Sequence, residues 1–330
     1  MRRILLLLAA LALIAPARAE HIKIGAIKTT SAGPLYLAIE RGYFKEVGID
    51  PELVFFDAAQ PIAVAVVSGG IEVGASGLTA GLYNLAGQGA LRIVAGQGHE
   101  APGFHALAFF EANQAYAAGL TSLDGLAGHS AGLTGQGTPA HYAMGIIAEK
   151  HGVALSSIKV MPLGSVPNIV SALTGGQVDV GVTVLTVPMM PQIERGDLRV
   201  LAWIGDELAM QDRATFVSTK MADEQHDLIE RFLAAYRKGA KDYHDALIGP
   251  DERPHDGPGA AEIIGLIAKY TGQPPEAVKL GIAYVEPMLR LNVADVLRQI
   301  AWYKTQGMVK PEVDGATFID QRYVVPLPEP

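Results

Sequence analysis

Four short segments have the composition of turns that bind an anion through backbone and hydroxyl groups. They are residues 30–34 (TSAGP), 76–79 (SGLT), 135–139 (GQGTP) and 183–186 (TVLT). Each follows an apolar run and precedes a stretch with helical features, so we expect a strand, a turn and then a helix. A helix that begins at such a turn offers unpaired N–H groups and a partial positive charge, which attract anions without lysine or arginine.

We expect these turns and the side chains nearest to them to form one binding site. Thr79 and Thr138 are also suited to cap their own helices, and for any single turn capping is the simpler reading. Four such turns in one chain favour the binding interpretation. The candidate ligand-binding residues are Thr30, Ser31, Gly33, Tyr36, Asp57, Ser76, Gly77, Thr79, Gln97, His99, Gln136, Gly137, Thr138, His141, Thr183 and Thr186.

Two glycine patterns resemble a dinucleotide-binding fingerprint, at residues 96–101 and 135–140. The first is followed by Pro-Gly instead of a helix. The second lacks the acid that should end the next strand, because residues 161–164 read Met-Pro-Leu-Gly. The nine histidines show no spacing typical of a metal site. We therefore expect neither a cofactor nor a bound metal.

Ser130 lies in Gly-His-Ser-Ala-Gly, which has the spelling of a hydrolase nucleophile elbow. That elbow requires a strand before the serine and a helix after it, whereas here a loop precedes and a strand follows. We expect Ser130 to be an ordinary strand residue. An exported hydrolase that uses Ser130 remains the alternative from another functional class.

The elements that position the four turns form a module that occurs twice. Residues 68–79 and 174–186 share a hydroxyl residue, two glycines, an acid inside an apolar run and a closing group of hydroxyls. Landmarks upstream keep the same order, namely Pro34 and Pro139, Tyr36 and Tyr142, Gly48 and Gly152, and Pro61 and Pro167. Two similar α/β units predict two lobes, and the cleft between them is where a small ligand is expected.

Short apolar runs alternate with helical stretches in both modules, which predicts mainly parallel sheets covered by helices on both faces. Residues 105–110 and 215–218 are the expected crossings between the lobes, and only helices are expected after residue 227. The predicted organisation is a signal peptide at 1–19, lobe 1 at 20–108 and 213–330, and lobe 2 at 109–212. The two crossings are the expected hinge.

The first nineteen residues have the pattern of a cleaved export signal. Arg2 and Arg3 precede an apolar run at residues 5–14, and Ala17-Arg18-Ala19 is an A-x-A cleavage site. The run is too short to span a membrane, which takes about 20 residues. Because the chain has no cysteine, it has no lipid-attachment site after the cut, and we expect a free periplasmic protein.

Composition also bears on partners. Loss of three arginines with the signal takes the formal charge from −8 to −11. Such an acidic surface argues against nucleic acid, whose affinity depends on Lys and Arg at phosphates. The absence of cysteine excludes disulfides, thiolate catalysis and Cys-ligated zinc.

Residues 34–49 (PLYLAIERGYFKEVGI) resemble the periplasmic solute-binding proteins of the nitrate/sulfonate/taurine ABC-transporter type, whose superfamily includes thiamine-pyrimidine-synthesis-like binding proteins. Residues 122–128 look like that family's entry into lobe 2, and residues 318–324 look like its ending. The resemblance covers essentially the whole mature chain. The cysteine-rich motif of the pyrimidine-synthesising enzymes is absent.

The resemblance implies an α/β, two-lobed periplasmic-binding-protein fold of type II, with a mainly parallel sheet in each lobe and extra C-terminal helices. It also implies a monomer that closes on a small molecule and docks on an ABC permease. We expect a small anionic ligand, such as a sulfonate, a carboxylate or nitrate. A neutral or pyrimidine ligand, stacked among Tyr36, Tyr142 and His99, is the alternative. The sequence does not distinguish a signalling role from a role in transport.

Overall fold

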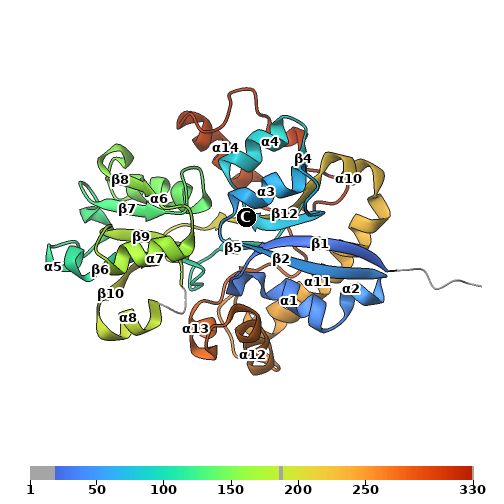
Figure 1. The fold of residues 1–330 in the computed structure, drawn as a ribbon, viewed down its shortest axis with the longest axis horizontal. Helices are drawn as coiled ribbons and strands as arrows, with labels where there is room; N and C mark the ends of the chain where they lie inside the picture. The colour runs from blue at the N-terminus through green and yellow to red at the C-terminus, as the bar shows by residue number, and fades with distance from the viewer. Residues whose placement is uncertain (1–18, 186–188, 329–330) are drawn as a thin grey trace, which may run out of the picture.

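The computed structural model describes residues 19–185 and 189–328. The predicted signal peptide lies outside the described residues except for Ala19, and so does Thr186. Figure 1 shows the described chain as two unequal units side by side, a smaller one built from β6 to β10 and a larger one built from both ends of the chain.

The larger unit contains a five-stranded sheet in the order β2-β1-β3-β12-β4. Four strands run in one direction, and β12 is antiparallel to both of its neighbours. The strands are β1 (Glu20–Ile27), β2 (Ile49–Phe56), β3 (Val73–Gly77), β4 (Leu91–Gly96) and β12 (Arg213–Ser218).

The smaller unit contains a second five-stranded sheet, in the order β8-β7-β9-β6-β10. Here β6 is the antiparallel strand, so order and directions match those of the first sheet. The strands are β6 (Leu107–Ala112), β7 (Ser130–Leu133), β8 (Lys159–Pro162), β9 (Val180–Val184) and β10 (Leu198–Trp203). The predicted crossing segment 215–218 lies in β12, and the predicted segment 105–110 overlaps β6 at residues 107–110.

The acid of the repeated sequence block makes the same contact in both units. The Lys23 N–H donates to Glu72 Oε2 at 2.7 Å, and the Ser130 N–H donates to Asp179 Oδ2 at 2.8 Å. Each carboxylate therefore joins a strand, β1 or β7, to the chain just before the neighbouring strand, β3 or β9. The repeated acid has a structural role in the sheet.

Helices cover both sheets. One face of the first sheet packs on α1, α2, α11 and α12 around the buried rings of Tyr36, Phe44 and Phe232. A second core runs from α3 and α4 through β7 and β9 to α6, so it is continuous between the units. The helices from residue 33 to residue 207 are α1 (Gly33–Glu40), α2 (Tyr43–Glu46), α3 (Gln60–Val67), α4 (Ala80–Gly87), α5 (Asn113–Ala117), α6 (Pro139–Lys150), α7 (Val166–Thr174), α8 (Met190–Arg195) and α9 (Ile204–Glu207).

The segment after β12 is mainly helical, as predicted, and packs on the first sheet. It contains α10 (Thr219–Glu224), α11 (His226–Leu247), α12 (Ala260–Thr271), α13 (Pro275–Leu280) and α14 (Val293–Thr305). The expectation of helices alone after residue 227 is wrong at one place, because residues 284–285 form the short strand β13 after α13 ends at Leu280. Strand β13 joins a three-stranded sheet, β11-β5-β13, with β5 (Gly98–Glu100) and β11 (Met210–Gln211).

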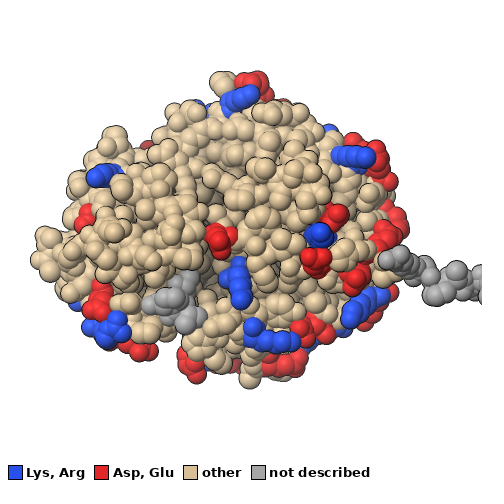
Figure 2. Space-filling view, viewed as in Figure 1, with Lys and Arg blue, Asp and Glu red and all other residues tan. Residues whose placement is uncertain are grey.

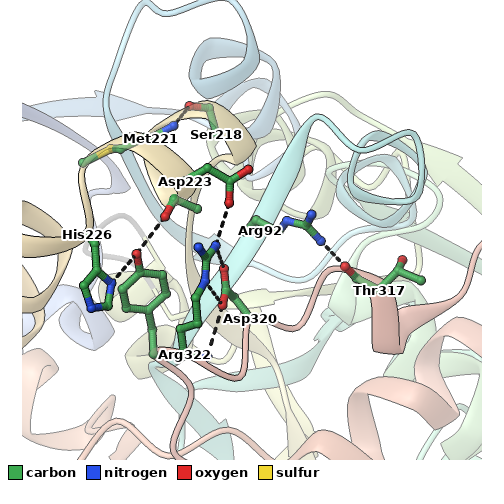
Figure 3. Close-up of polar contacts among 10 residues, drawn as sticks. Arg92, Ser218, Met221, Asp223, His226, Thr317, Asp320 and Arg322 are labelled. Carbon is green, nitrogen blue, oxygen red and sulfur yellow. Dashed lines mark hydrogen bonds and ion pairs between the residues drawn. The ribbon is translucent and has the colours of Figure 1, made fainter.

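Polar contacts hold the C-terminal segment against β4 and the α10–α11 junction (Figure 3). The Arg322 guanidinium donates to Asp320 and to Asp223, and the Tyr323 hydroxyl donates to the Ala222 carbonyl at 2.8 Å. Arg92 of β4 donates to the Thr317 carbonyl. These contacts make the last described residues part of the larger unit.

The shared role of the repeated acids is testable by denaturation. Asp179→Ala and Glu72→Ala each remove a charged acceptor of a backbone N–H, so we expect losses of about 1–2 kcal/mol in the free energy of unfolding. Asp197→Ala is the control, because Asp197 makes an exposed ion pair with Arg195 whose loss should change stability by at most about 0.5 kcal/mol. Equal urea midpoints for Asp179→Ala and Asp197→Ala would contradict the assignment.

Candidate functional site

A cavity of about 100 Å³ lies where the carboxyl ends of the parallel strands of both sheets face each other. That volume suits a compact solute of several non-hydrogen atoms, since one water takes roughly 10–15 Å³ by a similar measure. Much of the lining is apolar, including Ile27, Leu107 and Val182. The polar side chains that line it are Thr29, Ser31, Ser76, Gln97, Thr134, Thr138, Thr183, Asp212 and Arg213.

Six of the predicted ligand-binding residues line this cavity, and they come from all four predicted turns and the end of β4. They are Ser31, Ser76, Gly77, Gln97, Thr138 and Thr183. Ser31 follows β1, and Ser76 and Gly77 end β3, while Thr138 is the N-cap of α6 and Thr183 lies in β9. The parallel strand directions bring these distant segments to one place, as expected for α/β sheets.

Three predicted residues near α1 lie outside the lining and have structural contacts instead. The Thr30 hydroxyl donates to the Gly281 carbonyl at 2.9 Å. Tyr36 is buried, and its ring stacks on Tyr270 with centroids 4.4 Å apart. Gly33 packs against side chains of α11 and α12 with no room for a Cβ. These contacts fasten α1 to the C-terminal helices.

Other predicted residues lie at the contact between the units. The Gly137 carbonyl accepts from the Ala80 N–H at 2.8 Å, and the Gln136 carbonyl accepts from Gln60 Nε2 at 3.0 Å. The Thr79 hydroxyl accepts from the Leu82 N–H and caps α4. None of these three lines the cavity, and neither does Asp57, which is exposed at the start of the β2–α3 turn.

Of the two predicted histidines, His141 is buried and His99 is half-buried, and neither lines the cavity. Burial lowers the pKa of His99 and of His141 to about 4. The His99 ring packs on Tyr284, and His141 Nδ1 accepts from the Gly137 N–H at 3.1 Å. Both imidazoles are therefore neutral at neutral pH and supply no positive charge to a ligand.

Arg213 is a cavity residue that the sequence analysis missed, and its neighbour Asp212 is another. Arg213 begins β12 and pairs with Gly77 in the sheet. Because β12 is antiparallel to its neighbours, its first residue lies at the edge where the other strands end. The corresponding position in the second sheet is Leu107, which begins β6 and pairs with Val184.

Arg213 and Asp212 form a buried ion pair at the cavity. Arg213 Nη2 lies 2.8 Å from Asp212 Oδ2, and the two side chains are only 11% and 5% exposed. The Nη2–Oδ2 contact lacks the geometry of a hydrogen bond, and Arg213 Nε and Asp212 Oδ1 have no hydrogen-bond partner among the described residues. Ser76 Oγ and Gln97 Oε1 share this condition. Buried polar atoms without partners are costly, so their concentration here indicates a site that receives a polar solute.

The two units also touch beside the cavity through α14. The Tyr303 hydroxyl donates to the Thr138 carbonyl at 2.8 Å, and the Trp302 ring packs directly on Gly145 of α6. Thr138 lines the cavity and is held by α14, while its hydroxyl donates to the Gly135 carbonyl and caps α6. This contact fixes the start of α6, one of the helix N-termini that face the cavity.

Ser130 is a strand residue at the start of β7, as predicted, and it does not line the cavity. Its hydroxyl donates to Asp179 Oδ2 at 2.8 Å. His129 also contacts that carboxylate, at 3.4 Å, so the histidine and the serine share an acid and do not form a nucleophile–base pair. The arrangement does not favour the hydrolase alternative.

Surface charge, groups of possible metal ligands and helix hydropathy indicate no further site among the described residues. Acidic and basic side chains are interspersed on the face shown in Figure 2, with no basic patch there. Among residues 19–185 and 189–328, no group of His, Cys, Asp or Glu side chains could hold a metal ion. No helix in the same ranges is both long and apolar enough to cross a membrane.

Comparisons with known proteins agree on family and fold. The profile of the family described as "NMT1/THI5 like" matches residues 29–252. The alkanesulfonate-binding protein SsuA from Xanthomonas axonopodis pv. citri, solved bound to MOPS, is 20% identical, with a TM-score of 0.71 over 92% of this chain and 98% of that one. The nitrate-binding protein NrtA from Synechocystis PCC 6803 is 12% identical, with a TM-score of 0.70 over 92% of this chain and 86% of that one.

The desulfurization enzyme DSZB is 15% identical, with a TM-score of 0.59 over 91% of this chain and 96% of that one. At these identities the solved structures show a shared fold only, which confirms the predicted periplasmic-binding-protein fold. Among curated proteins, none matches the chain in sequence.

The buried state of the two histidines can be measured by the pH dependence of their ring-proton NMR shifts. We expect His99 and His141 to titrate near pH 4, because burial disfavours their charged forms. His21 and His151, whose carboxylate neighbours raise their pKa, should titrate above the ordinary 6.5. Titration of His99 or His141 at the ordinary value would contradict the packing described here.

Proposed function

We propose, from the premise that the chain belongs to the NMT1/THI5-like family, that it is the periplasmic solute-binding component of an ABC importer. The protein captures a small organic anion in its cavity and delivers it to a membrane permease. Export by a cleaved signal at residues 1–19 places it in the periplasm, where it acts as a monomer.

The observation that carries this proposal is the guanidinium of Arg213 in the cavity wall. It is buried, it has donors without partners, and hydroxyls from both units surround the same cavity. Guanidinium donors match carboxylate and sulfonate oxygens in geometry and charge. Thr138 at the start of α6 and Val166 at the start of α7 add helix N-termini that favour an anion.

The shape and chemistry of the lining favour an aliphatic anion. The cavity is small, and much of its wall consists of alanine, valine, leucine and isoleucine side chains. No aromatic side chain is among the described lining residues, and Tyr36, Tyr142 and His99 lie elsewhere. A short sulfonate or carboxylate thus fits better than a stacked pyrimidine. The names of two relatives, an alkanesulfonate-binding and a nitrate-binding protein, support an anion in this fold.

Binding and closure belong to one equilibrium in this proposal. Residues 20–108 and 213–330 form one lobe, residues 109–212 form the other, and the two connecting segments are the hinge. A solute that contacts both lobes stabilises the closed arrangement and shifts the population toward it. The Ala80–Gly137 and Gln60–Gln136 hydrogen bonds are the protein contacts of the closed form.

A binding role is favoured over an enzymatic one by the chemistry of the lining. The relative DSZB shows that this fold also occurs in an enzyme, so the fold does not decide the question. The described lining contains hydroxyls but no histidine, lysine or cysteine that could activate them. Ser130, the candidate nucleophile, is bound to Asp179 away from the cavity.

The proposal is tested by titration calorimetry with C2–C4 sulfonates, the matching carboxylates, nitrate and pyrimidines. We expect the wild-type protein to bind at least one aliphatic anion and no pyrimidine. Arg213→Met should weaken that binding by at least about 30-fold, because truncating one partner of a buried charge pair costs 2 kcal/mol or more.

The matched control is Arg195→Met, because Arg195 is an exposed arginine of α8 outside the cavity lining. It should bind like the wild type, and thermal unfolding should show that both variants are folded. Unchanged affinity in Arg213→Met, or no binding of any anion, would contradict the proposal.

A further inference from the structure

Helix α14 is fastened to α4, its neighbour in the larger unit (Figure 1). The Tyr83 hydroxyl of α4 donates to Gln299 Oε1 of α14 at 3.0 Å, and both side chains are buried. Just after α14, the Met308 carbonyl accepts from Asn84 Nδ2 at 2.8 Å, and Asn84 Oδ1 accepts from the Lys310 N–H at 3.0 Å. These hydrogen bonds hold α14 and the residues after it on α4, so α14 belongs to the larger unit.

The first turns of α14 also bind β11, the short strand that directly precedes β12 and the proposed hinge. The Gln211 N–H donates to Asp295 Oδ2 at 2.7 Å, and Gln211 Oε1 accepts from the Asn292 N–H at 3.0 Å. Gln299 Nε2 donates to the Gln211 carbonyl. The side chains of Gln211, Asp295 and Gln299 are buried. One end of α14 is therefore anchored where the chain passes between the units.

The last turns of α14 contact α6 of the smaller unit. The Trp302 ring packs edge-to-face on His141 and on Tyr142, with ring centroids 5.5 Å and 5.4 Å away. Gly145 lies one turn after His141, on the same face of α6. A Cβ on Gly145 would lie 2.3 Å from Trp302 Cζ2. Gly145 is therefore the residue of α6 that leaves room for the indole ring.

The contacts of α14 with α6 join the two units without involving the cavity. The Tyr303 hydroxyl donates to the Thr138 carbonyl at 2.8 Å, and neither Tyr303 nor Trp302 lines the cavity. Their formation therefore requires no solute. Because α14 is bound to α4 of the other unit, separation of the units breaks both contacts.

We propose that α14 is a latch that holds the two units together in the absence of a solute, with Trp302 packed on α6 and Tyr303 bound to the Thr138 carbonyl. Tyr303 is thus a positioning residue that acts on the cavity through Thr138. The inference rests on the proposed function only in its premise that the units open and close. Because the latch adds to the population of the closed form, it raises the apparent affinity for every solute by the same factor.

The test measures the distance between the units in the protein without added solute, after unfolding and refolding to remove any co-purified solute. The chain has no cysteine, so spin labels can be attached at Gln88→Cys and Glu149→Cys. Gln88 at the end of α4 and Glu149 of α6 are exposed and lie outside the cavity lining. Double electron–electron resonance then gives the ratio of the near arrangement to the far one. We expect the near arrangement to be populated in the wild type.

The variant Tyr303→Phe removes only the hydroxyl. We expect the ratio of near to far arrangement to fall about fivefold, the effect of one hydrogen bond. The matched control is Tyr243→Phe, because the Tyr243 hydroxyl donates to the Ala283 carbonyl at 3.0 Å within the larger unit. Both variants should lose a similar amount of thermal stability, but Tyr243→Phe should leave the distances as in the wild type.

The variant Gly145→Ala tests the ring contact. Alanine is favoured over glycine inside a helix, so the smaller unit itself should not be weakened. The added methyl group meets the ring of Trp302, and we expect the ratio of near to far arrangement to fall about tenfold. In a Trp302→Ala background this obstacle is absent, so Gly145→Ala should have no further effect on the distances.

The outcomes separate this inference from the proposed function. A wild-type protein found only in the far arrangement overturns the latch, as do unchanged distances in both Tyr303→Phe and Gly145→Ala. An equal effect of Gly145→Ala with and without Trp302, or equal opening in Tyr303→Phe and Tyr243→Phe, also overturns it. None of these results affects the binding of anions by the wild type, which calorimetry decides separately.

Discussion

Strand direction is the constraint on which the cavity depends. Parallel strands bring their carboxyl ends to one edge of a sheet, and the single antiparallel strand in each sheet brings its first residue to that same edge. In the first sheet this residue is Arg213, placed beside Gly77 at the end of β3. In the second it is Leu107, beside Val184. A duplicated scaffold thus presents two different side chains, a guanidinium and an aliphatic chain, from equivalent positions at the cavity.

Burial of Arg213 requires compensation, and the chain supplies it from the adjacent residue. Taking a guanidinium out of water costs several kcal/mol, which a contacting carboxylate offsets only in part when donors remain unpartnered. Nε and Nη2 of Arg213 are in that condition, as is Oδ1 of Asp212. The ion pair therefore lowers the free-energy cost of burying Arg213 without a solute, and it leaves hydrogen-bonding groups of both side chains available. Burial and the Asp212 charge raise the pKa of Glu100, the neighbouring acid in β5.

The sequence alone predicted the elements and the edge at which the site lies, because both follow from periodicity and strand–turn–helix order. It could not separate Ser31, which lines the cavity, from Thr30, which bonds to Gly281, because side-chain direction within a turn depends on tertiary packing. His99 follows the end of β4 and was expected to face the ligand, but it lies in the short strand β5 and its ring packs against Tyr284. Arg213 was missed because it begins an antiparallel strand, whereas the predicted site residues lie at or after the ends of strands.

In the proposed binding role, protein contacts hold the rim of the cavity and a solute pairs with the groups of its interior, so recognition is linked to closure. The carbonyls of Gly137 and Thr138 accept from Ala80 and Tyr303 of the other unit, so the rim is satisfied whenever the units meet. The interior atoms of Arg213 have no such partner. Closure without a solute would bury these donors unsatisfied, whereas closure around a matching solute satisfies them. The free-energy difference between the two closed states is therefore largest for a solute that pairs with every unpartnered atom, so the same contacts select the ligand and favour the closed form.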